Sequence, residues 1–260
     1  MNTIRKVGNM EDDKKRQLWI KILFIVFVVV LLLLSIPSKF IDASGWGYSR
    51  NEEHKIPEIG KYADMIEGKN AYYVGNGKTI YLTFDAGYDN GVLPDILTVL
   101  KDKKVAATFF VTGDFVKRFT PLLKNMINDG HLIGNHSYGH LANDKISSKQ
   151  LMEDVHKLEE VYFEKTNSVL AKIYRPPEGR FTEESLETLK NNGYKTFFWS
   201  VAFVDWKGTK TDSYNNVINN LHDGAIILLH TVSRSNMEAL GDIIDEVRRQ
   251  GYEFKLLTEI

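Results

Sequence analysis

Five short apolar runs in this chain each end on a polar residue that can do chemistry. The runs are rich in Ile, Val, Phe and Tyr, which is typical of β-strands. The residues that follow them are Asp85, His136, Arg175, Asp205 and His230. In an α/β barrel the active site forms at the carboxyl ends of the strands. Five such residues at the same relative position therefore predict a catalytic site.

Helix-like segments alternate with these runs, and several end in a polar residue followed by glycine. Asp129-Gly130 and Gln250-Gly251 are examples, and glycine just after the last helical residue is the expected helix stop. Strands are expected at residues 80–84, 105–111, 132–134, 172–174, 195–201, 225–229 and 253–257. Helices are expected at residues 92–103, 114–128, 148–165, 182–192, 213–222 and 236–250. This alternation predicts an α/β fold with a parallel sheet of seven strands.

Such a sheet can close into a barrel or stay open and doubly wound, and the periodicity does not choose between the two. No glycine-rich phosphate-binding run follows any of the expected strands. A dinucleotide-binding fold needs such a run, because its glycines let the backbone approach the pyrophosphate. The sequence therefore weighs against that fold.

The N-terminal part of the chain is expected to enter a membrane. From Trp19 to Ile36 the only charged residue is Lys21, and a basic region precedes this stretch. That order favours export of the following domain, with the N-terminus inside. A stretch of about 18 residues is at the lower limit for crossing a bilayer. An uncleaved anchor and a cleaved signal peptide both stay open, and the lack of a strong small-x-small cleavage site favours the anchor.

The expected organisation is a cytoplasmic tail at 1–18, a transmembrane or signal-anchor segment at 19–36, a stem at 37–77 and a catalytic domain at 78–260. The domain would then lie on the extracytoplasmic side of the cell membrane, or be secreted after cleavage. Beyond residue 41 the chain holds 26 basic and 31 acidic residues, a net charge of about −5. Nucleic-acid binding usually shows a basic excess, so no such partner is expected. The chain has no cysteine, which excludes disulfides and thiolate metal sites.

His136 and His140 are candidate ligands of a divalent metal. Three residues that include Gly139 separate them, which suggests a loop or a single turn after a strand. Neutral imidazoles suit zinc and similar ions. Such a pair is often only a surface or core feature, but its place after a strand favours the metal site.

The two aspartates and His230 suggest acid–base chemistry. Asp85 follows a strand, where a carboxylate can act as a general base toward water, although it could also cap the next helix. Asp205 and His230 form a second carboxylate–imidazole possibility, in which the carboxylate would fix the tautomer and stabilise the protonated ring. Each residue alone could equally be a hydrogen-bonded structural group.

The segment from Arg175 to Gly179 contains two prolines, which stiffen the backbone and remove hydrogen-bond donors. This turn can direct Arg175 and the amide N–H groups of Glu178 and Gly179 inward, or it can be a rim loop with a surface arginine. Trp206 and Leu228 are neighbours of catalytic candidates. They can belong to the core or line a small apolar pocket.

Taken together, these motifs resemble the polysaccharide deacetylase family, the NodB-homology domain of family 4 carbohydrate esterases. The resemblance covers about residues 78–258 and rests on five ordered motifs. These are Thr83 to Gly87, His136 to His140, Arg175 to Gly179, Asp205-Trp206, and Leu228 to His230. It implies a distorted (β/α) barrel of seven strands and a polysaccharide or peptidoglycan N-deacetylase.

The resemblance also implies roles for the residues. Asp85 would be the base and His230 the acid, with Asp205 supporting the histidine. Arg175 would help to hold the acidic residues, and Leu228 and Trp206 would line the acetyl pocket. A divalent metal, zinc or similar, would bind His136 and His140. The family's remaining metal ligand, a second aspartate, is replaced by Ala86, which cannot coordinate an ion.

The chain is similar in particular to the branch of the family that makes muramic δ-lactam in spore cortex peptidoglycan. That branch also lacks the second aspartate, and the surroundings of Asp85, Asp205 and His230 look alike. The resemblance implies removal of the acetyl group from N-acetylmuramic acid on peptide-stripped glycan strands, with a wall amidase as a possible functional partner. Three alternatives stay open: an N-acetylglucosamine deacetylase, an inactive wall-binding module, and a membrane protein whose external domain only docks other proteins.

Overall fold

The computed structural model describes residues 44–49, 53–205 and 207–260. These residues belong to a compact unit, Ala43–Ile260. The tail and the membrane segment expected at 1–36 lie outside the described residues, as does Trp206. In the part of the chain that is described, no helix is long and apolar enough to cross a bilayer.

The centre of the fold is a sheet whose strands follow the order β10-β3-β4-β5-β6-β8-β2, with β9 also paired to β3. Every strand pair in this sheet is parallel. Past the end of β8, Val201 forms a further parallel bridge with Ile227 of β9. A second, antiparallel bridge joins Val74, just after β2, to Ala225, just before β9. The two bridges link the β8–β2 end of the sheet to β9, so the fold is barrel-like and the open doubly wound alternative does not apply.

The strands are short, as the sequence indicated. They are β2 (Ala71–Tyr72), β3 (Thr79–Ala86), β4 (Thr108–Val111), β5 (Leu132–Asn135), β6 (Ile173–Tyr174), β8 (Lys195–Phe197), β9 (Ile226–His230) and β10 (Glu253–Phe254). A separate antiparallel pair joins β1 (Ser44–Gly45) to β7 (Arg180–Phe181). The seven expected strands all exist, although several are shorter than expected, and β2 makes an eighth.

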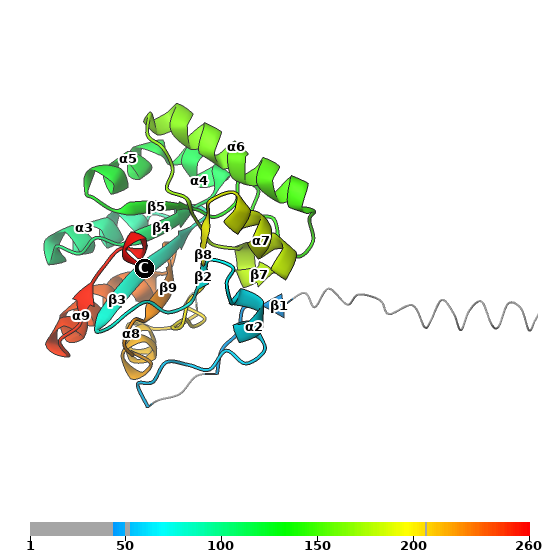
Figure 1. The fold of residues 1–260 in the computed structure, drawn as a ribbon. Coiled ribbons are helices and arrows are strands. Elements are labelled where there is room, and N and C mark those ends of the chain that lie inside the picture. Colours follow the sequence, from blue (N-terminus) through cyan, green and yellow to red (C-terminus); the bar gives the residue numbers. More distant parts are fainter. Residues whose placement is uncertain (1–43, 50–52, 206) are drawn as a thin grey trace, which may run out of the picture. The chain divides into compact units, whose positions relative to one another are not determined.

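Helices surround the sheet (Figure 1). They are α2 (Tyr62–Ile66), α3 (Leu93–Lys103), α4 (Gly113–Arg118), α5 (Thr120–Asn128), α6 (Ser148–Thr166), α7 (Glu183–Asn191), α8 (Lys210–Asn219) and α9 (Arg234–Arg249). The single helix expected at 114–128 is wrong, because a new helix begins at Thr120. Pro121 lies in the first turn of that second helix, where its missing N–H costs no hydrogen bond. Ser147 and Gln150 form the expected capping box of α6.

The main core lies between the sheet and the helices. Phe84, Phe109 and Leu229 are fully buried there against α3 and α9. Burying each such side chain contributes roughly 1.5–3 kcal/mol, an upper estimate for a compact unfolded chain. This core fixes β3, β4 and β9 side by side, so the residues at their carboxyl ends must lie close together.

A smaller aromatic core includes residues before β3. Trp46, Ile59 and Ile66 pack with Phe181 and Phe198, and the Trp46 and Phe198 rings stack at 4.3 Å between centroids. The described residues 44–49 and 53–77 therefore include side chains that pack against the barrel, and this part of the expected stem belongs to the compact unit.

Candidate active site

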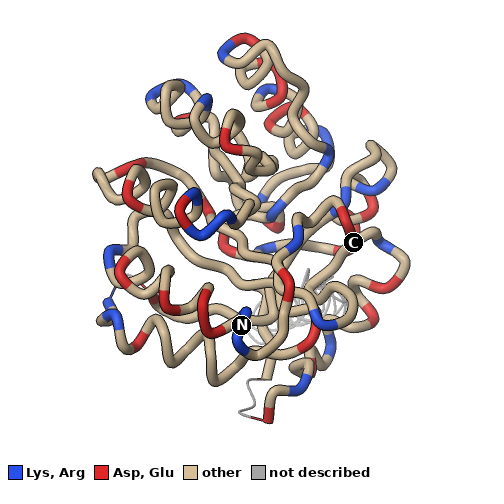
Figure 2. Tube along the Cα trace, turned by 90° about the vertical axis from the view of Figure 1, so that its left-hand side faces the viewer, with Lys and Arg blue, Asp and Glu red and all other residues tan. Residues whose placement is uncertain are grey.

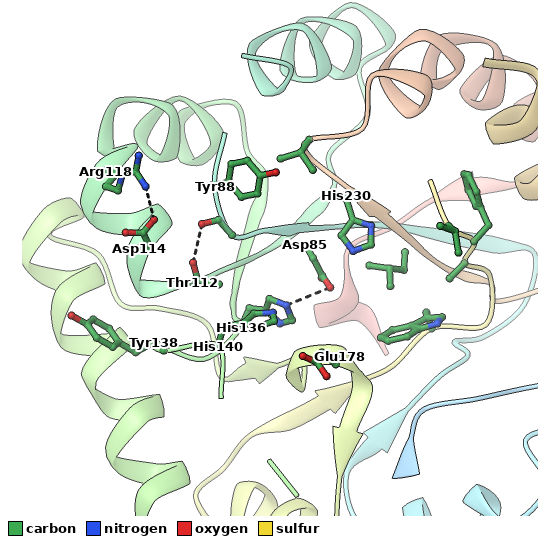
Figure 3. A pocket seen from close by; sticks show the side chains of 18 of the residues that line it. Asp85, Tyr88, Thr112, Asp114, Arg118, His136, Tyr138, His140, Glu178 and His230 are labelled. Carbon is green, nitrogen blue, oxygen red and sulfur yellow. Dashed lines mark hydrogen bonds and ion pairs between the residues drawn. The ribbon is translucent and has the colours of Figure 1, made fainter. Parts of the chain in front are cut away.

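One large cleft of about 1140 Å³ lies at the strand ends, and Asp85, His136, His140 and His230 line it. Arg175 and Asp205, the other two polar residues expected there, are buried and hydrogen-bond to Asp85 and His230. Figure 3 shows Asp85 and His230 beside each other, with the two other histidines facing Asp85. Asp85 and His230 are direct neighbours in the β3–β9 register. The cleft exceeds the usual 300–1000 Å³ of a small-ligand pocket, so it has room for several sugar units.

Arg175 anchors the carboxylate of Asp85. Its side chain is completely buried, and Nη1 donates to Asp85 Oδ1 at 3.0 Å and to Thr83 Oγ1 at 2.9 Å. Burial alone would raise the pKa of Asp85. The positive charges of the Arg175 guanidinium and of protonated His230, with the Arg175 hydrogen bond, outweigh burial and hold this pKa below its ordinary value. Asp85 is therefore ionised at neutral pH and able to accept a proton.

The Arg175 backbone orients the first histidine. Its carbonyl oxygen lies 2.9 Å from His136 Nδ1, and a carbonyl can only accept, so Nδ1 carries the proton. Burial lowers the pKa of His136, which keeps the ring neutral. The lone pair of Nε2 then faces Asp85 Oδ2 across 3.5 Å. Two acceptors face each other there, an arrangement that suits a cation or a bridging donor.

Asp154 of α6 holds the loop between the two histidines. Its carboxylate accepts from Ser137 Oγ at 2.7 Å and from the N–H groups of Tyr138 and Gly139 at 2.7 and 2.8 Å. Ser137 and His140 have positive φ angles of 68° and 54°, a conformation that costs energy for residues with a Cβ. The hydrogen bonds of Asp154 offset that cost and keep the two rings at 5.1 Å between centroids.

Asp205 and His230 form the expected carboxylate–imidazole pair. His230 Nδ1 lies 3.0 Å from Asp205 Oδ1, and the His230 backbone N–H donates to Oδ2 at 2.9 Å. Burial alone would lower the pKa of His230. The hydrogen bond to Asp205, with the negative charges of Asp85 and Asp205, raises it above its ordinary value. His230 is therefore suited to donate a proton near neutral pH.

Side chains at the N-terminus of α9 hold Asp205 in place by hydrogen bonds. Asn236 is buried, and its Nδ2 donates to Asp205 Oδ2. Ser233 and Ser235 donate to the Asp205 carbonyl oxygen at 2.8 and 2.9 Å. The opposite amide orientation would place Asn236 Oδ1 against the carboxylate, so the donor orientation is the one that physics allows. This network leaves Asp205 only 1% exposed.

The remaining expected site residues are placed as follows. Leu228 and Glu178 line the cleft, and Glu178 has a strained φ of 56°. Gly179 does not supply a free N–H, because this group donates to the Pro176 carbonyl at 3.0 Å within the turn. The Glu178 amide therefore remains as the donor candidate of this turn. Trp206 lies outside the described residues.

Two residues near the N-terminus also shape the cleft. Trp46 Nε1 donates to the Trp199 carbonyl at 2.8 Å, and the Tyr48 hydroxyl accepts from the Ala202 N–H at 2.7 Å. Both contacts fix the segment that leads to Asp205, and Tyr48 itself lines the cleft. No motif marked these residues, because the region reads as a mixed stem. Asp154 and Asn236 were equally hidden among the polar residues of amphipathic helices.

Known proteins share this arrangement. The sequence model described as "Polysaccharide deacetylase" matches residues 73–197. The chain is 45% identical over 222 residues to the "Peptidoglycan-N-acetylmuramic acid deacetylase PdaA" of Bacillus subtilis, covering 83% of this chain and 84% of that protein. This chain is a polysaccharide deacetylase. It is accordingly a hydrolase of amide bonds.

Further relatives place this polysaccharide deacetylase in carbohydrate esterase family 4. The solved structure of Bacillus subtilis PdaA, "a family 4 Carbohydrate esterase", superposes with a TM-score of 0.81 at 44% identity, covering 84% of this chain and 97% of that one. A "Peptidoglycan-N-acetylglucosamine deacetylase" of Bacillus cereus is 34% identical over 207 residues, covering 78% of this chain and 73% of that protein. The family resemblance seen in the sequence is confirmed.

Enzymes of this family are generally metal-dependent. Here the donor set fits an ion held by His136 and His140, since His136 donates through Nδ1 to a backbone carbonyl, as metal-ligating histidines usually do. Among residues 44–49, 53–205 and 207–260, no cluster of three His, Cys, Asp or Glu could hold a metal. Ala86 stands at the position of the family's second aspartate. The donors that the described residues would offer such an ion are thus the two imidazoles.

Proposed function

We propose that this deacetylase removes the N-acetyl group of N-acetylmuramic acid in peptidoglycan, on glycan strands whose stem peptides have been cut away. The similarity to a muramic acid deacetylase over most of both chains supports this choice. The observation that carries the chemistry is the pairing of an ionised Asp85 with a His230 of raised pKa in one cleft. A general base and a general acid on the two sides of the scissile amide are what hydrolysis requires.

In the mechanism we propose, Asp85 Oδ2 accepts a proton from the attacking water. Its other oxygen stays bonded to Arg175, which fixes the direction of the free lone pairs. As the C–N bond breaks, His230 Nε2 gives a proton to the leaving amine. Asp205 holds Nδ1 of that ring and stabilises its positive charge. After one turnover Asp85 is protonated and His230 is neutral, and proton exchange with solvent restores the starting protonation state of both.

The developing oxyanion needs a hydrogen-bond donor. The Glu178 amide in the strained Arg175–Gly179 turn is the candidate that this proposal uses, and such a donor contributes about 10²–10³-fold in rate. A divalent ion on His136 and His140, when bound, would polarise the acetamide carbonyl. Titration of zinc against the wild-type chain and a His140→Ala variant by calorimetry tests that site without reference to activity. Equal heats from both proteins would reject it.

The acetyl group would enter an apolar recess beside these residues. Leu228 and Trp199 both line the cleft, and Leu228 is only 6% exposed. We propose that Leu228 contacts the acetyl methyl. Discrimination by one methyl-sized pocket is worth about 1–3 kcal/mol, enough to prefer acetyl over formyl or propionyl groups.

After deacetylation, the freed amine is next to the lactyl carboxyl group of the same sugar. Formation of an amide between them releases one water and gives the muramic δ-lactam of spore cortex. We also propose that residues 19–36 anchor the enzyme to the cell membrane, with the catalytic domain outside it, and that a wall amidase prepares its substrate. Both proposals rest on the apolar N-terminal sequence and the expected need for stripped strands.

The test compares acetate release from three glycans at equal acetyl concentration. These are peptide-stripped strands, intact peptidoglycan, and a polymer of N-acetylglucosamine alone. We expect release from the stripped strands to be fastest. Faster release from the glucosamine polymer would favour the alternative suggested by the Bacillus cereus relative. Tight binding to strands without acetate release from any of them would favour an inactive wall-binding module.

A further inference from the structure

Two lysine side chains contact the side chain of Tyr138 at one end of the cleft. Lys117 of α4 donates to the Tyr138 hydroxyl at 3.2 Å, and its Nζ lies 5.0 Å from the ring centroid. Lys157 of α6 lies over the same ring at 4.2 Å. Tyr138 and Lys117 line the cleft that contains Asp85 and His230. In Figure 3 Tyr138 lies to one side of the catalytic centre, beyond His140.

The two ammonium groups have no acidic partner in the described part of the chain. No Asp or Glu there pairs with Lys117 or Lys157, whereas Lys101 and Lys103, for example, each pair with an aspartate. Each ammonium has three N–H donors, and Lys117 uses one of them on Tyr138. Both lysines are exposed to solvent, so their remaining donors are accessible to a ligand.

The positive charge of Lys117 and Lys157 contrasts with the charge of the rest of the chain. Neighbouring Arg118 pairs with Asp114 at 3.0 Å, and the nearby Asp154 carboxylate accepts hydrogen bonds from Ser137, Tyr138 and Gly139, so neither acid is paired with the two lysines. Beyond residue 41 the chain carries a net charge of about −5. Over the rest of the fold, acidic and basic residues are interspersed along the helices (Figure 2). An exposed cationic end on a catalytic cleft favours substrates with negative charge near the reacting group.

We propose that Lys117 and Lys157, spaced by the Tyr138 ring, form a subsite for a carboxylate of the glycan substrate. The inference rests on the proposed function and extends it to how the enzyme reads its substrate. In intact peptidoglycan the lactyl carboxyl group of muramic acid is tied up in an amide bond and is neutral. Removal of the stem peptide frees it as a carboxylate on every muramic residue. A cationic subsite thus distinguishes stripped from unstripped strands by charge.

The energetics predict a moderate, salt-sensitive preference. The lysines are exposed, so solvent screens their attraction for a carboxylate, and ionic strength weakens it further. We expect the two together to favour the free carboxylate by about threefold to tenfold in kcat/KM at low salt. Ammonium groups are compact point charges without the fork geometry of arginine, which suits a carboxylate on a rotatable lactyl ether.

The experiment uses the full-length chain in detergent and two forms of stripped strands. One form keeps the free lactyl carboxylate, and in the other this group is converted to the methylamide by carbodiimide coupling. The variant is Lys117→Gln with Lys157→Gln. The matched control is Lys124→Gln with Lys149→Gln, which likewise removes two lysines, one from α5 and one from α6, neither of which lines the cleft. Thermal melts verify that all proteins are folded.

We expect the wild type and the control to prefer the free carboxylate, mainly through KM, and this preference to shrink as salt is added. In the cleft variant the ratio of kcat/KM for the two strands should fall toward one. A ratio equal to that of the control would overturn the subsite. So would a wild-type enzyme that cleaves both strands equally well, although the proposed function would then stand. Failure of the wild type on both muramyl strands, with activity on glucosamine polymers, would instead overturn the proposed function.

Discussion

Replacement of Arg175 by methionine tests how the barrel interior supports the catalytic base. The guanidinium makes hydrogen bonds to Asp85, Thr83 and the carbonyl oxygens of Phe197 and Phe198. Methionine fills much of the same space but leaves these acceptors without their donor. Asp85, whose side chain is 11% exposed, would then be a nearly buried charge without its partner.

The loss can be estimated from the burial of this pair. Removal of one partner of a buried ion pair costs ~3–5 kcal/mol, because the other charge remains uncompensated. For a domain of this size each kcal/mol shifts the melting temperature by about 2–4 °C. Arg175→Met should therefore melt roughly 6–20 °C below the wild type at pH 7.

The loss of stability caused by Arg175→Met should become smaller as the pH falls. The pKa of Asp85 in the folded enzyme is below its ordinary value, so its ion pair contributes stability above the unfolded pKa of about 3.9 and loses it as pH falls through the folded pKa. In the variant, protonation of Asp85 removes the unpaired charge. The difference in melting temperature between variant and wild type should narrow from pH 7 toward pH 3.

Thermal denaturation by circular dichroism across this pH range is the assay. Arg249→Met is the control, because Arg249 also pairs with a carboxylate, that of Glu246, through two hydrogen bonds, but its side chain is 73% exposed. Solvent screens that pair, so its loss should change the melting temperature little. An Arg175 variant that melts with the wild type, or whose deficit is constant with pH, would refute the reasoning.

Other variants test the catalytic assignments. Asp85→Asn and His230→Ala should each lower kcat by about 10²–10⁴-fold without unfolding the enzyme, and near-wild-type turnover in either would reject its role. Because the pKa of His230 is raised and its protonated form is the acid, activity should fall as pH rises through that pKa. Asp205→Asn removes a negative charge that raises it, so this basic limb should move to lower pH; an unmoved limb would contradict the pairing. Asn236→Ala should lower kcat by about tenfold with little change in KM, while Asn220→Ala at the C-terminal cap of α8 should not, and equal effects from the two would remove the positioning role of Asn236.

The site residues at the strand ends could be predicted from the sequence for a physical reason. Parallel strands that are buried on both faces read as apolar runs, and a polar residue directly after such a run must lie at the edge of the core. Asp85, Arg175 and His230 followed this rule, and the structure brings them together. Closure of the barrel did not follow from periodicity, because it depends on isolated bridges next to β9, from Val201 beyond β8 and from Val74 beyond β2.

The supporting residues could not be predicted in the same way. Asp154 acts on the loop of the two histidines from a helix, and Asn236 acts on Asp205 from another. Each lies in a pattern that any solvated helix would show, so only the packing of that helix reveals its partner. Tyr48 was hidden for a different reason, since its contact with Ala202 spans more than 150 residues.

The measurement that tests the central claim most directly is the mass of the sugar product. The purified enzyme is incubated with peptide-stripped strands, which are then cut to disaccharides and analysed by mass spectrometry. The proposed function predicts that the muramic residue loses one acetyl group and then one water, while the glucosamine residue keeps its acetyl group. Loss of acetyl from glucosamine alone, with muramic acid unchanged, would contradict it.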